Sequence, residues 1–373
     1  MNEFMRIGDI CNILNGYAFK SSKYVADGIR VIRITNVQKG FVEDTNPQYY
    51  PVSEQREIEK YMLCEGDLLM SLTGNVGRVG LLSAEMLPAA LNQRVACIRI
   101  RNPAVIYKPF LFHLLNSDYF ENKCILASQG VAQKNMSTEW LKEYPIPSFS
   151  MDKQMEIASI FDKIDDLIAR RKEQVRNMDQ AVKSRFIELF GDIVLNPFGW
   201  EKDYLGVVCD VRDGTHDSPH YHSTGFPLVT SKNVTGGEID LTDCSLISEA
   251  DFNKINERSK VNMGDIIMPM IGTVGKPVIV NVEPNFAIKN VSLIKFKDDS
   301  RVLNTFVRSL LQSDYFDDAV LSKVRGGTQK FISLGDIRKL AVIVPPMELQ
   351  EQFAAFVEQT DKSKLCSKME VAA

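Results

Sequence analysis

Residues 114–134 read LLNSDYFENKCILASQGVAQK, and residues 310–330 read LLQSDYFDDAVLSKVRGGTQK. The two stretches lie 196 positions apart, and the match continues on both sides of them. Upstream, GDLLMSLTGNVGRVGLL at 66–82 aligns with GDIIMPMIGTVGKPVIV at 264–280, and GIRVIRITNVQKG at 28–40 aligns with GFPLVTSKNVTGG at 225–237. Downstream, Gln154 falls on Gln350. A match of this length indicates that a whole domain is repeated, together with the segment that follows it.

Each copy begins with short β-branched or apolar runs bounded by Gly, which predict strands. These runs are IRVIRI at 29–34, GDLLMSL at 66–72 and VACIRI at 95–100, with PLVTS at 227–231, GDIIMPM at 264–270 and VSLIKF at 291–296 as their counterparts. A helix is predicted over 110–120 and 306–316, where apolar residues recur at intervals of three and four. Ser117 and Ser313 then start the next element. The predicted fold class is α+β, with two similar domains of mixed strands and helices separated by long coiled-coil helices.

The segment that joins the two copies has a different pattern. Residues 151–190 contain eight Lys or Arg and eight Asp or Glu, but no Gly or Pro, so a continuous helix roughly 60 Å long is predicted. Apolar residues at steps of four and three form a coiled-coil seam, made of Ile157, Phe161, Ile164, Ile168, Val175, Met178, Val182 and Leu189. A stripe of this length must pair with another helix, and residues 347–373, with Phe353 and Val357 on the seam, are the expected partner. The predicted boundaries are therefore 1–150, 151–190, 191–346 and 347–373.

Composition restricts the class of protein. The chain of 373 residues is 45% hydrophobic and 25% charged, with a formal net charge of -4, which is typical of a globular protein without a strong basic signature. The start, MNEFMRIGDICNIL, lacks a signal pattern, and no run of 18 apolar residues occurs, so we expect a cytoplasmic protein without a membrane segment. The seven cysteines are widely spaced and form no C-x-x-C pair, which predicts reduced thiols.

Four stretches carry a resemblance to a known family. They are SRFIELFGDIVLNPFGWE at 184–201, DGTHDSPHY at 213–221, FPLVTSKNV at 226–234 and GDIIMPMIGTVGK at 264–276. In this order, with two similar domains each followed by a helix, the chain resembles the specificity subunit of type I restriction-modification systems. The family's distal helix is comparable in length to its central helix, whereas the segment at 347–373 is shorter, so the spacing between the two domains stays open.

The resemblance implies a function and partners. The two repeated domains would be target recognition domains, each reading one part of an interrupted double-stranded DNA target, in a chain that is itself not an enzyme. The implied partners are methyltransferase (modification) subunits and restriction/motor subunits. S-adenosylmethionine, ATP and Mg are expected in these partner subunits, and no cofactor is expected in this chain.

Several motifs are candidates for catalysis or for metal binding. LNPFGWE at 195–201 lacks the second Pro of the Asn-Pro-Pro-aromatic element of adenine methyltransferases, so a structural turn is predicted there. GNVGRVG at 74–80 and RGGTQK at 325–330 match neither dinucleotide nor phosphate loops. His216, His220 and His222 could form a metal site with Asp213 or Asp217, but a polar binding loop is favoured, so no metal site is predicted. His113 lies in an apolar helical run and is predicted to be structural.

DNA contacts are predicted from the loops, because neither domain is basic overall: residues 1–150 carry 16 basic and 15 acidic side chains, and residues 191–346 carry 17 and 20. Loops after the strands are rich in the polar side chains that bond base edges and phosphates. In the first copy the candidates are Lys20, Ser21, Lys23, Thr35, Gln38, Thr73, Asn75, Arg78, Gln129, Gln133 and Lys134. In the second copy they are His216, Ser218, His220, Tyr221, Ser231, Lys232, Thr273, Lys276, Arg325, Gln329 and Lys330. A solvated loop position is the alternative for each, and Asn36 and Asn233 favour turn formation.

Two other functions stay open at this point. One is a self-contained DNA methyltransferase or nuclease, which the absence of a cofactor loop or acidic cluster in the sequence disfavours. The other is a scaffold that uses two similar domains and a coiled coil to bind proteins only.

Overall fold

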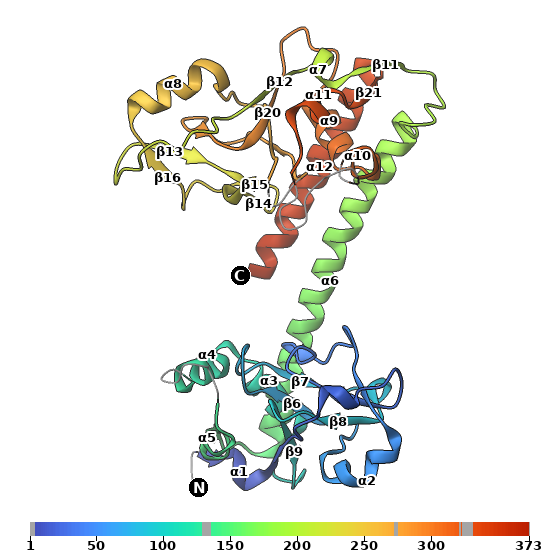
Figure 1. The fold of residues 1–373 in the computed structure, drawn as a ribbon, viewed down its shortest axis with the longest axis vertical. Coiled ribbons are helices and arrows are strands. Elements are labelled where there is room, and N and C mark those ends of the chain that lie inside the picture. The colour runs from blue at the N-terminus through green and yellow to red at the C-terminus, as the bar shows by residue number, and fades with distance from the viewer. Residues whose placement is uncertain (1–3, 129–135, 272–274, 321, 323–330, 373) are drawn as a thin grey trace. The chain divides into compact units, whose positions relative to one another are not determined.

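The computed structural model describes residues 4–128, 136–271, 275–320, 322 and 331–372. The chain divides into two compact units, unit 1 from Met1–Leu167 and unit 2 from Ile168–Ala373. The boundary falls within one helix, α6 (Met151–Phe190), which Figure 1 traces without interruption. Among the described residues, no helix has the length and apolar composition needed to cross a membrane.

Unit 1 is built on two sheets and a strand pair. The larger sheet has the order β2-β9-β6-β7-β4, and the smaller sheet has the order β5-β3-β8. The larger sheet consists of β2 (Cys11–Asn15), β9 (Val95–Ile100), β6 (Leu68–Ser71), β7 (Val79–Leu81) and β4 (Gly40–Phe41). The smaller consists of β5 (Tyr49–Tyr50), β3 (Ile29–Ile32) and β8 (Ala89–Leu91), and β1 (Phe4–Arg6) pairs with β10 (Pro145–Pro147).

The helices of unit 1 are short, apart from the beginning of α6. They are α1 (Ile7–Ile10), α2 (Gln55–Ile58), α3 (Lys108–Leu115), α4 (Asp118–Ala127) and α5 (Thr138–Glu143), with single 3-10 turns at η1 (Ser21–Lys23), η2 (Val52–Glu54), η3 (Glu59–Tyr61) and η4 (Ala84–Met86). The apolar side chains of α3 and α4 pack on one face of the larger sheet in a continuous core.

Unit 2 repeats this topology, except that its larger sheet has four strands and that β14 and β15 form a separate two-stranded sheet. Its sheets have the orders β12-β20-β17-β18 and β16-β13-β19, and β11 pairs with β21 as β1 pairs with β10. The strands are β11 (Glu201–Tyr204), β12 (Asp210–Asp213), β13 (Phe226–Val229), β14 (Val234–Thr235), β15 (Glu238–Ile239), β16 (Ser245–Ile247), β17 (Ile266–Pro269), β18 (Val278–Ile279), β19 (Ala287–Ile288), β20 (Val291–Lys295) and β21 (Ala341–Val344). The helices are α7 (Leu205–Val208), α8 (Glu249–Ser259), α9 (Asn304–Leu311), α10 (Asp314–Ala319), α11 (Leu334–Arg338) and α12 (Met347–Ala372), with a 3-10 turn at η5 (Ser231–Asn233). The repeat read from the sequence and the predicted α+β class are confirmed.

The repeated SDYF stretch joins two helices in each unit. Ser117 caps α4, since its hydroxyl accepts a hydrogen bond from the backbone N–H of Phe120 at 3.2 Å. Ser313 occupies the same position before α10. Phe120 and Phe316 are both fully buried. The stretch is therefore part of the framework, as the sequence pattern predicts.

A buried glutamine attaches the long helix to the domain before it, and it does so twice. In unit 1 the amide oxygen of Gln154 accepts from the backbone N–H of Tyr107 at 2.8 Å, and its nitrogen donates to the carbonyls of Val105 and Phe149 at 3.0 and 2.9 Å. In unit 2 the amide of Gln350 makes the same three kinds of bond. Its partners are Leu303 N–H at 2.8 Å and the carbonyls of Arg301 and Pro345 at 3.0 and 2.8 Å. Both side chains are fully buried, so each clamp satisfies backbone groups that would otherwise lack partners.

Within unit 2, the second half of α6 lies antiparallel to α12. The centre of the Phe353 ring on α12 lies 5.5 Å from the ring centres of Phe186 and Phe190 on α6. The Lys364 ammonium lies later in α12 and pairs with the carboxylate of Asp179, which lies earlier in α6, at 2.7 Å. Val182 and Leu189 pack into the same core as buried Phe353 and Val357. Ile168, Val175 and Met178 are half-buried along the same stripe. The structure therefore places Val182 and Leu189 in one core with α12, whereas the seam role of Ile168, Val175 and Met178 stays a prediction.

The first half of α6 departs from the predicted seam. Ile157 packs against the apolar core of unit 1, to which α3 contributes. Phe161 and Ile164 are 46% and 43% exposed. The sequence predicts a short second helix, and the assignment of Ile157, Phe161 and Ile164 to a coiled-coil or partner surface stays a prediction.

Candidate nucleic-acid interface

A glycine brings two distant loops of unit 1 into backbone contact. A Cβ atom at Gly16 would lie 2.2 Å from the carbonyl group of Asn92, so no other residue fits this approach. The backbone N–H of Tyr17 donates to Leu91 at 2.8 Å, and the N–H of Gln93 donates back to Tyr17 at 2.9 Å. Residues 92–94, which we call the central turn of unit 1, connect β8 to β9.

Two further loops converge on this central turn. The N–H of Asn92 donates to the carbonyl of Ile32 at the end of β3, at 3.2 Å. The N–H of Leu72, just after β6, donates to the carbonyl of Arg94 at 3.0 Å. The loops that follow β2, β3 and β6 therefore meet at one edge of unit 1, and these loops carry the described DNA-contact candidates.

Gln38 and Arg78, 40 residues apart, are in direct contact. The Arg78 guanidinium donates to the Gln38 amide oxygen at 2.8 Å, and the Gln38 nitrogen donates to Glu43 at 2.7 Å and to the Thr35 carbonyl at 3.1 Å. Gln38 therefore fixes the orientation of Arg78. Asn75 is exposed on the loop that also carries Arg78, whereas Thr73 is half-buried there and its hydroxyl is buried.

Lys20, Ser21 and Lys23 lie in and beside η1, on the loop that follows β2. Lys20 and Ser21 are exposed, whereas the Lys23 ammonium donates to Glu54 at 2.8 Å and lies 5.9 Å from the centre of the Tyr50 ring. The hydrogen bond to Glu54 raises the pKa of Lys23. Since a carboxylate already compensates its charge, Lys23 is less available to a phosphate than Lys20.

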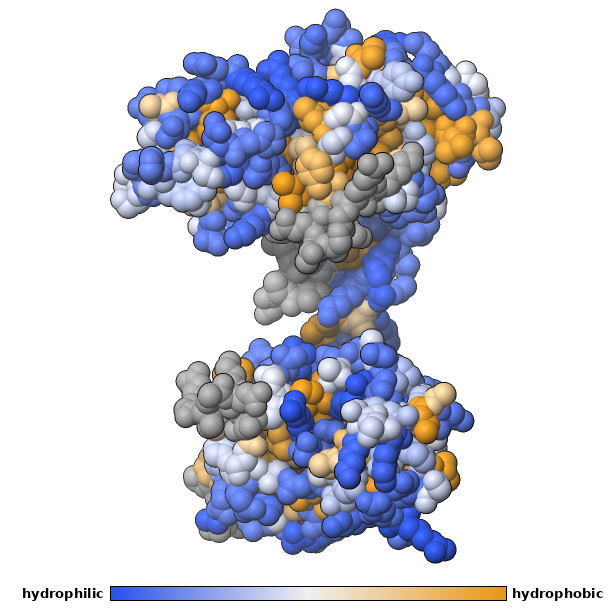
Figure 2. Space-filling model, in the orientation of Figure 1, coloured by the Kyte–Doolittle hydropathy of each residue, from blue (hydrophilic) through white to orange (hydrophobic). Residues whose placement is uncertain are grey.

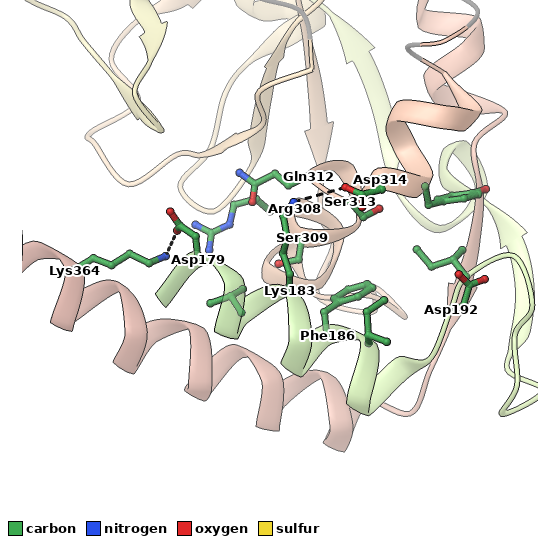
Figure 3. A pocket seen from close by; sticks show the side chains of 14 residues that line it. Asp179, Lys183, Phe186, Asp192, Arg308, Ser309, Gln312, Ser313, Asp314 and Lys364 are labelled. Carbon is green, nitrogen blue, oxygen red and sulfur yellow. Dashed lines mark ion pairs between the residues drawn. The ribbon is translucent and has the colours of Figure 1, made fainter. Parts of the chain in front are cut away.

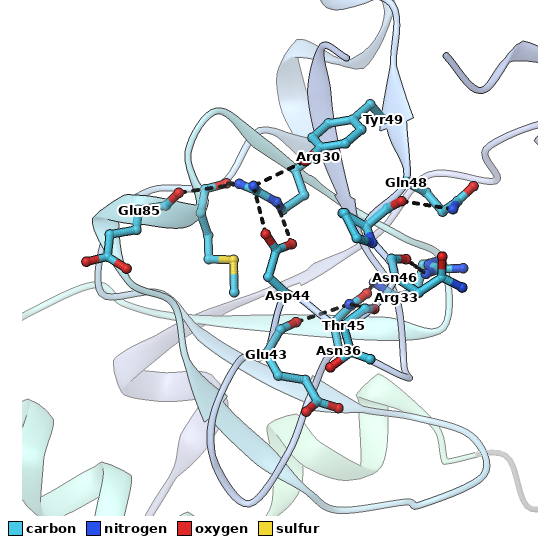
Figure 4. Close-up of polar contacts among 12 residues, drawn as sticks. Arg30, Arg33, Asn36, Glu43, Asp44, Thr45, Asn46, Gln48, Tyr49 and Glu85 are labelled. Carbon is cyan, nitrogen blue, oxygen red and sulfur yellow. Dashed lines mark hydrogen bonds and ion pairs between the residues drawn. The ribbon is translucent and has the colours of Figure 1, made fainter. Parts of the chain in front are cut away.

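The loop after β3 is held in shape by an arginine and an asparagine (Figure 4). Arg30 donates to the Asp44 carboxylate at 3.1 Å and to the Met86 carbonyl at 2.7 Å. The Asn36 amide accepts from the N–H of Arg33 at 3.0 Å and donates to the Glu43 carbonyl at 3.1 Å. In unit 2, Asn233 likewise accepts from the N–H of Thr230 at 3.0 Å. The turn-forming role predicted for both asparagines is confirmed.

Unit 2 has its own central turn, Lys289 and Asn290. A Cβ at Gly214 would lie 2.4 Å from the Ile288 carbonyl oxygen. Two backbone hydrogen bonds hold this approach: the N–H of Thr215 donates to the Ile288 carbonyl at 3.0 Å, and the N–H of Asn290 donates to the Thr215 carbonyl at 3.2 Å. The N–H of Lys289 donates to Val229 at the end of β13, at 2.9 Å. The loops after β12 and β13 therefore meet as their counterparts do in unit 1.

The described candidates of unit 2 surround this turn or lie on neighbouring loops. His216 bonds to Asn290 at 2.9 Å, and Lys289 donates to the Ser218 hydroxyl at 2.7 Å. His220, Tyr221, Lys232 and Lys276 are exposed, and Ser231 is half-buried at the start of η5. Seven candidates lie outside the described residues, namely Gln129, Gln133, Lys134, Thr273, Arg325, Gln329 and Lys330.

The central turns themselves were missed by sequence reasoning. Gln93 and Arg94 are exposed, polar and adjacent to the loops after β2 and β6, and Lys289 and Asn290 contact two candidates directly. The available signal was a polar turn between two apolar runs at the same place in both copies, which can also be read as a simple connection.

The rejected catalytic motifs are structural where the structure describes them. Asn196, with a positive φ of 47°, accepts from the Trp200 N–H at 2.9 Å and donates to the Trp200 carbonyl at 2.8 Å, which makes LNPFGWE a closed turn as predicted. Within the described parts of the chain, no group of three His, Cys, Asp or Glu side chains is arranged to hold a metal ion.

A cavity of about 510 Å³ lies in unit 2 between α6, α9 and α10 (Figure 3). Lys183 approaches Asp314 at 3.7 Å across it, and Lys364 pairs with Asp179 at one end. Val182, Phe186 and other apolar side chains line it together with these charged groups. None of the DNA-contact candidates among the described residues lines this cavity, and its described lining comes mainly from the helices.

The family of type I restriction modification DNA specificity domains matches residues 2–177 and 197–369. The chain belongs to this family. The type I restriction enzyme EcoBI specificity subunit of Escherichia coli is 25% identical over 382 residues, which cover 94% of this chain and 77% of that protein. The EcoAI specificity subunit of Escherichia coli is 33% identical over 171 residues, which cover 44% of this chain and 28% of that protein. The prediction of a specificity subunit, and not of a catalytic chain, is confirmed by the family.

Solved structures share the fold of this specificity-domain chain. The type I restriction-modification S subunit from M. genitalium matches with a TM-score of 0.52 at 15% identity, over 99% of this chain and 91% of that one. A chain from a structure on complex assembly and conformational transition of the type I R-M system matches with a TM-score of 0.57 at 18% identity, over 99% and 92%.

Proposed function

We propose that this chain is the DNA-recognition subunit of a type I restriction-modification complex, in which each unit reads one part of a bipartite double-stranded target. The observation that carries the proposal is the pair of central turns. Each gathers loops that are distant in sequence onto one edge of the same framework, and the side chains on the two edges differ. Contacts to base edges carry the sequence specificity, whereas contacts to phosphates position the protein on the duplex. Different side chains on one framework would therefore read different half-sites.

The first half of α6 supports a docking surface for the modification subunits. Residues 151–167 contain five acidic and two basic side chains, and Phe161 and Ile164 are exposed among them. His113, only 10% exposed, stacks on Phe161 with ring centres 5.4 Å apart and bonds to Asp162 at 2.7 Å. His113 therefore holds the exposed Phe161 ring in one position. An acidic surface with a fixed apolar stripe suits an amphipathic segment with basic flanks.

The same proposal assigns the chemistry to other chains. S-adenosylmethionine would bind in the modification subunits, and ATP and Mg in the restriction/motor subunits, while this chain supplies DNA contacts and docking. The face of each unit that Figure 2 shows is mostly hydrophilic, with scattered hydrophobic residues, as expected of a surface that contacts DNA through polar loops.

Reconstitution tests this function. Purified alone, the chain should transfer no methyl groups. When the chain is combined with its cognate modification subunit, the complex should methylate adenine in a two-part motif, and mapping of the modified bases measures this. Exchange of residues 1–150 for the equivalent domain of a relative should change one half of the motif only. Ile164→Lys should weaken assembly with the modification subunit, whereas Lys172→Ala, an exposed change outside the stripe, should not.

Each outcome has a defined meaning. Methylation by the isolated chain would instead identify a self-contained methyltransferase. Unchanged genome methylation after deletion of the gene would favour a protein-binding scaffold. A change in both halves of the motif after the domain exchange would contradict the assignment of one half to each unit.

A further inference from the structure

His216 in unit 2 occupies an unusual position for an exposed loop histidine. Its side chain is 61% exposed, yet both ring nitrogens are bonded: Nε2 lies 2.9 Å from an Asp213 carboxylate oxygen, and Nδ1 lies 2.9 Å from the Asn290 amide oxygen. Asp213 is 10% exposed at its side chain, and its second oxygen accepts a hydrogen bond from Arg258. The histidine therefore joins the end of β12, the start of the loop after it and the central turn.

Two oxygen acceptors require two donors. A neutral imidazole carries one N–H, whereas an imidazolium carries two, so this geometry favours the charged ring. The hydrogen bonds to Asn290 and then to Asp213 raise the pKa of His216, and the partial burial of the ring and the nearby Arg258 oppose them. The other charged groups around the ring are Asp217 on its own loop, Asp251 and Lys254 on α8, and Lys289 on the central turn. Hydrogen bonds to carboxylate and amide oxygens thus outweigh both the partial burial and the neighbouring cations.

Unit 1 lacks this device at the equivalent place. Gly16 and Gly214 make the same close approach to their central turns, which fixes the correspondence of the residues beside them. The residue before the glycine is Asn15 in unit 1 and Asp213 in unit 2, and Ala18 stands where unit 2 has His216. The framework is shared, and the charged pair is confined to unit 2.

We infer that Asp213 is a positioning residue that, with Asn290, holds His216 as a cation at the DNA-facing edge of unit 2, so that this unit alone binds its half-site with pH-dependent strength. The inference rests on the proposed DNA-recognition function. The charge is complete below the pKa of His216 and disappears as the pH rises through it, so affinity for the target falls over the same interval. A cation beside the phosphates or a base acceptor contributes roughly three- to tenfold in affinity, and the size depends on salt.

The first measurement concerns the ring itself. The histidine C–H resonances of the full chain are followed from pH 5 to 9, and His216→Ala identifies the His216 signal. We expect a His216 pKa above the ordinary value of about 6.5. Asp213→Asn, which copies Asn15, should lower it, and so should Asn290→Gly, which removes the acceptor and retains a residue suited to the positive φ of 56° at this position. A His216 pKa at or below the ordinary value would mean that the Asn290 amide presents its nitrogen to the ring, and would overturn the inference.

The second measurement concerns DNA. The complex of this chain with its cognate modification subunit is titrated with a duplex that carries the mapped target, at constant salt, between pH 6 and 9. Wild type should lose roughly three- to tenfold in affinity as the pH rises, His216→Ala should bind with the weaker affinity throughout, and Asp213→Asn should move the change to lower pH. His222→Ala is the matched control for loss of an exposed histidine and should keep the wild-type profile.

The two ideas can fail separately. Absence of target binding at every pH would overturn the proposed function. Target binding with the same pH profile in wild type and His216→Ala would overturn only the role of Asp213 and His216. Duplexes altered in one half-site, assigned to its unit by domain exchange, should lose the pH dependence when the half read by unit 2 is changed, and should keep it when the other half is changed.

Discussion

Units 1 and 2 have the same framework and different exposed chemistry. Both use a buried glutamine as a clamp, Gln154 or Gln350, and both use a glycine for a close backbone approach, Gly16 or Gly214. These shared groups bond to backbone or leave room for it, so their role does not depend on which DNA is read. The groups that differ, Ala18 against His216 for example, point from the loops. The comparison separates residues that build the reader from residues that read.

A buried ion pair is shared by the two units in its charge but differs in its residue type. Asp67 in unit 1 receives two hydrogen bonds from Arg99, at 2.8 and 2.5 Å, while Asp265 in unit 2 receives one from Lys295 at 2.6 Å. Both carboxylates also accept from the backbone N–H three residues before them, at 2.8 Å, and both are nearly fully buried. The framework therefore requires a cation at this position, and either a planar or a point charge satisfies it.

The largest effect is expected at the glycines of the close approach. Gly16→Ala and Gly214→Ala would each place a Cβ 2.2 to 2.4 Å from backbone carbonyl atoms, so the loop and the central turn must move apart, and the free energy of unfolding should fall by roughly 3 to 4 kcal/mol. Urea denaturation of the full chain measures this. Gly335→Ala, whose added Cβ has 3.6 Å to the nearest atom, is the control and should change stability by less than about 1 kcal/mol. Equal stability of all three variants would show that the approach is not required.

The glutamine clamps come next. Gln154→Ala or Gln350→Ala would leave buried backbone groups without partners, and each should lower the free energy of unfolding by roughly 3 kcal/mol. If urea denaturation shows a similar decrease in the free energy of unfolding for both variants, the two glutamines have the same role in the duplicated framework. Gln180→Ala on the exposed face of α6 should stay within about 0.5 kcal/mol of wild type. A loss confined to one unit would break the equivalence.

The ion pair should give the smallest change. Arg99→Lys keeps the charge and removes one of two hydrogen bonds to Asp67, which should cost about 1 kcal/mol. Lys295→Arg keeps the charge and adds a donor beside Asp265, so it should cost less. Thermal denaturation of both variants provides the test, and a larger loss for Lys295→Arg would reverse the expected order.

Much of the framework could be predicted from local pattern. Alternating and continuous apolar runs placed β6, β9 and their counterparts, and three-four spacing placed α3 and α6, because each depends on which side chains one element must bury. The turn roles of Asn36 and Asn233 were also accessible, since an asparagine side chain bonds to backbone within a few residues.

What the sequence by itself determined is the duplication, the α+β character of each copy and the helix that joins them, because periodicity and internal repetition are properties of neighbouring positions. Tertiary structure alone decided which loops meet. Gly16 touches Asn92 and Gln38 touches Arg78 through contacts between strands distant in the chain, and no local spacing encodes them. It also decided which part of the α6 stripe is covered, since a seam shows that a helix needs a partner but not how far that partner extends.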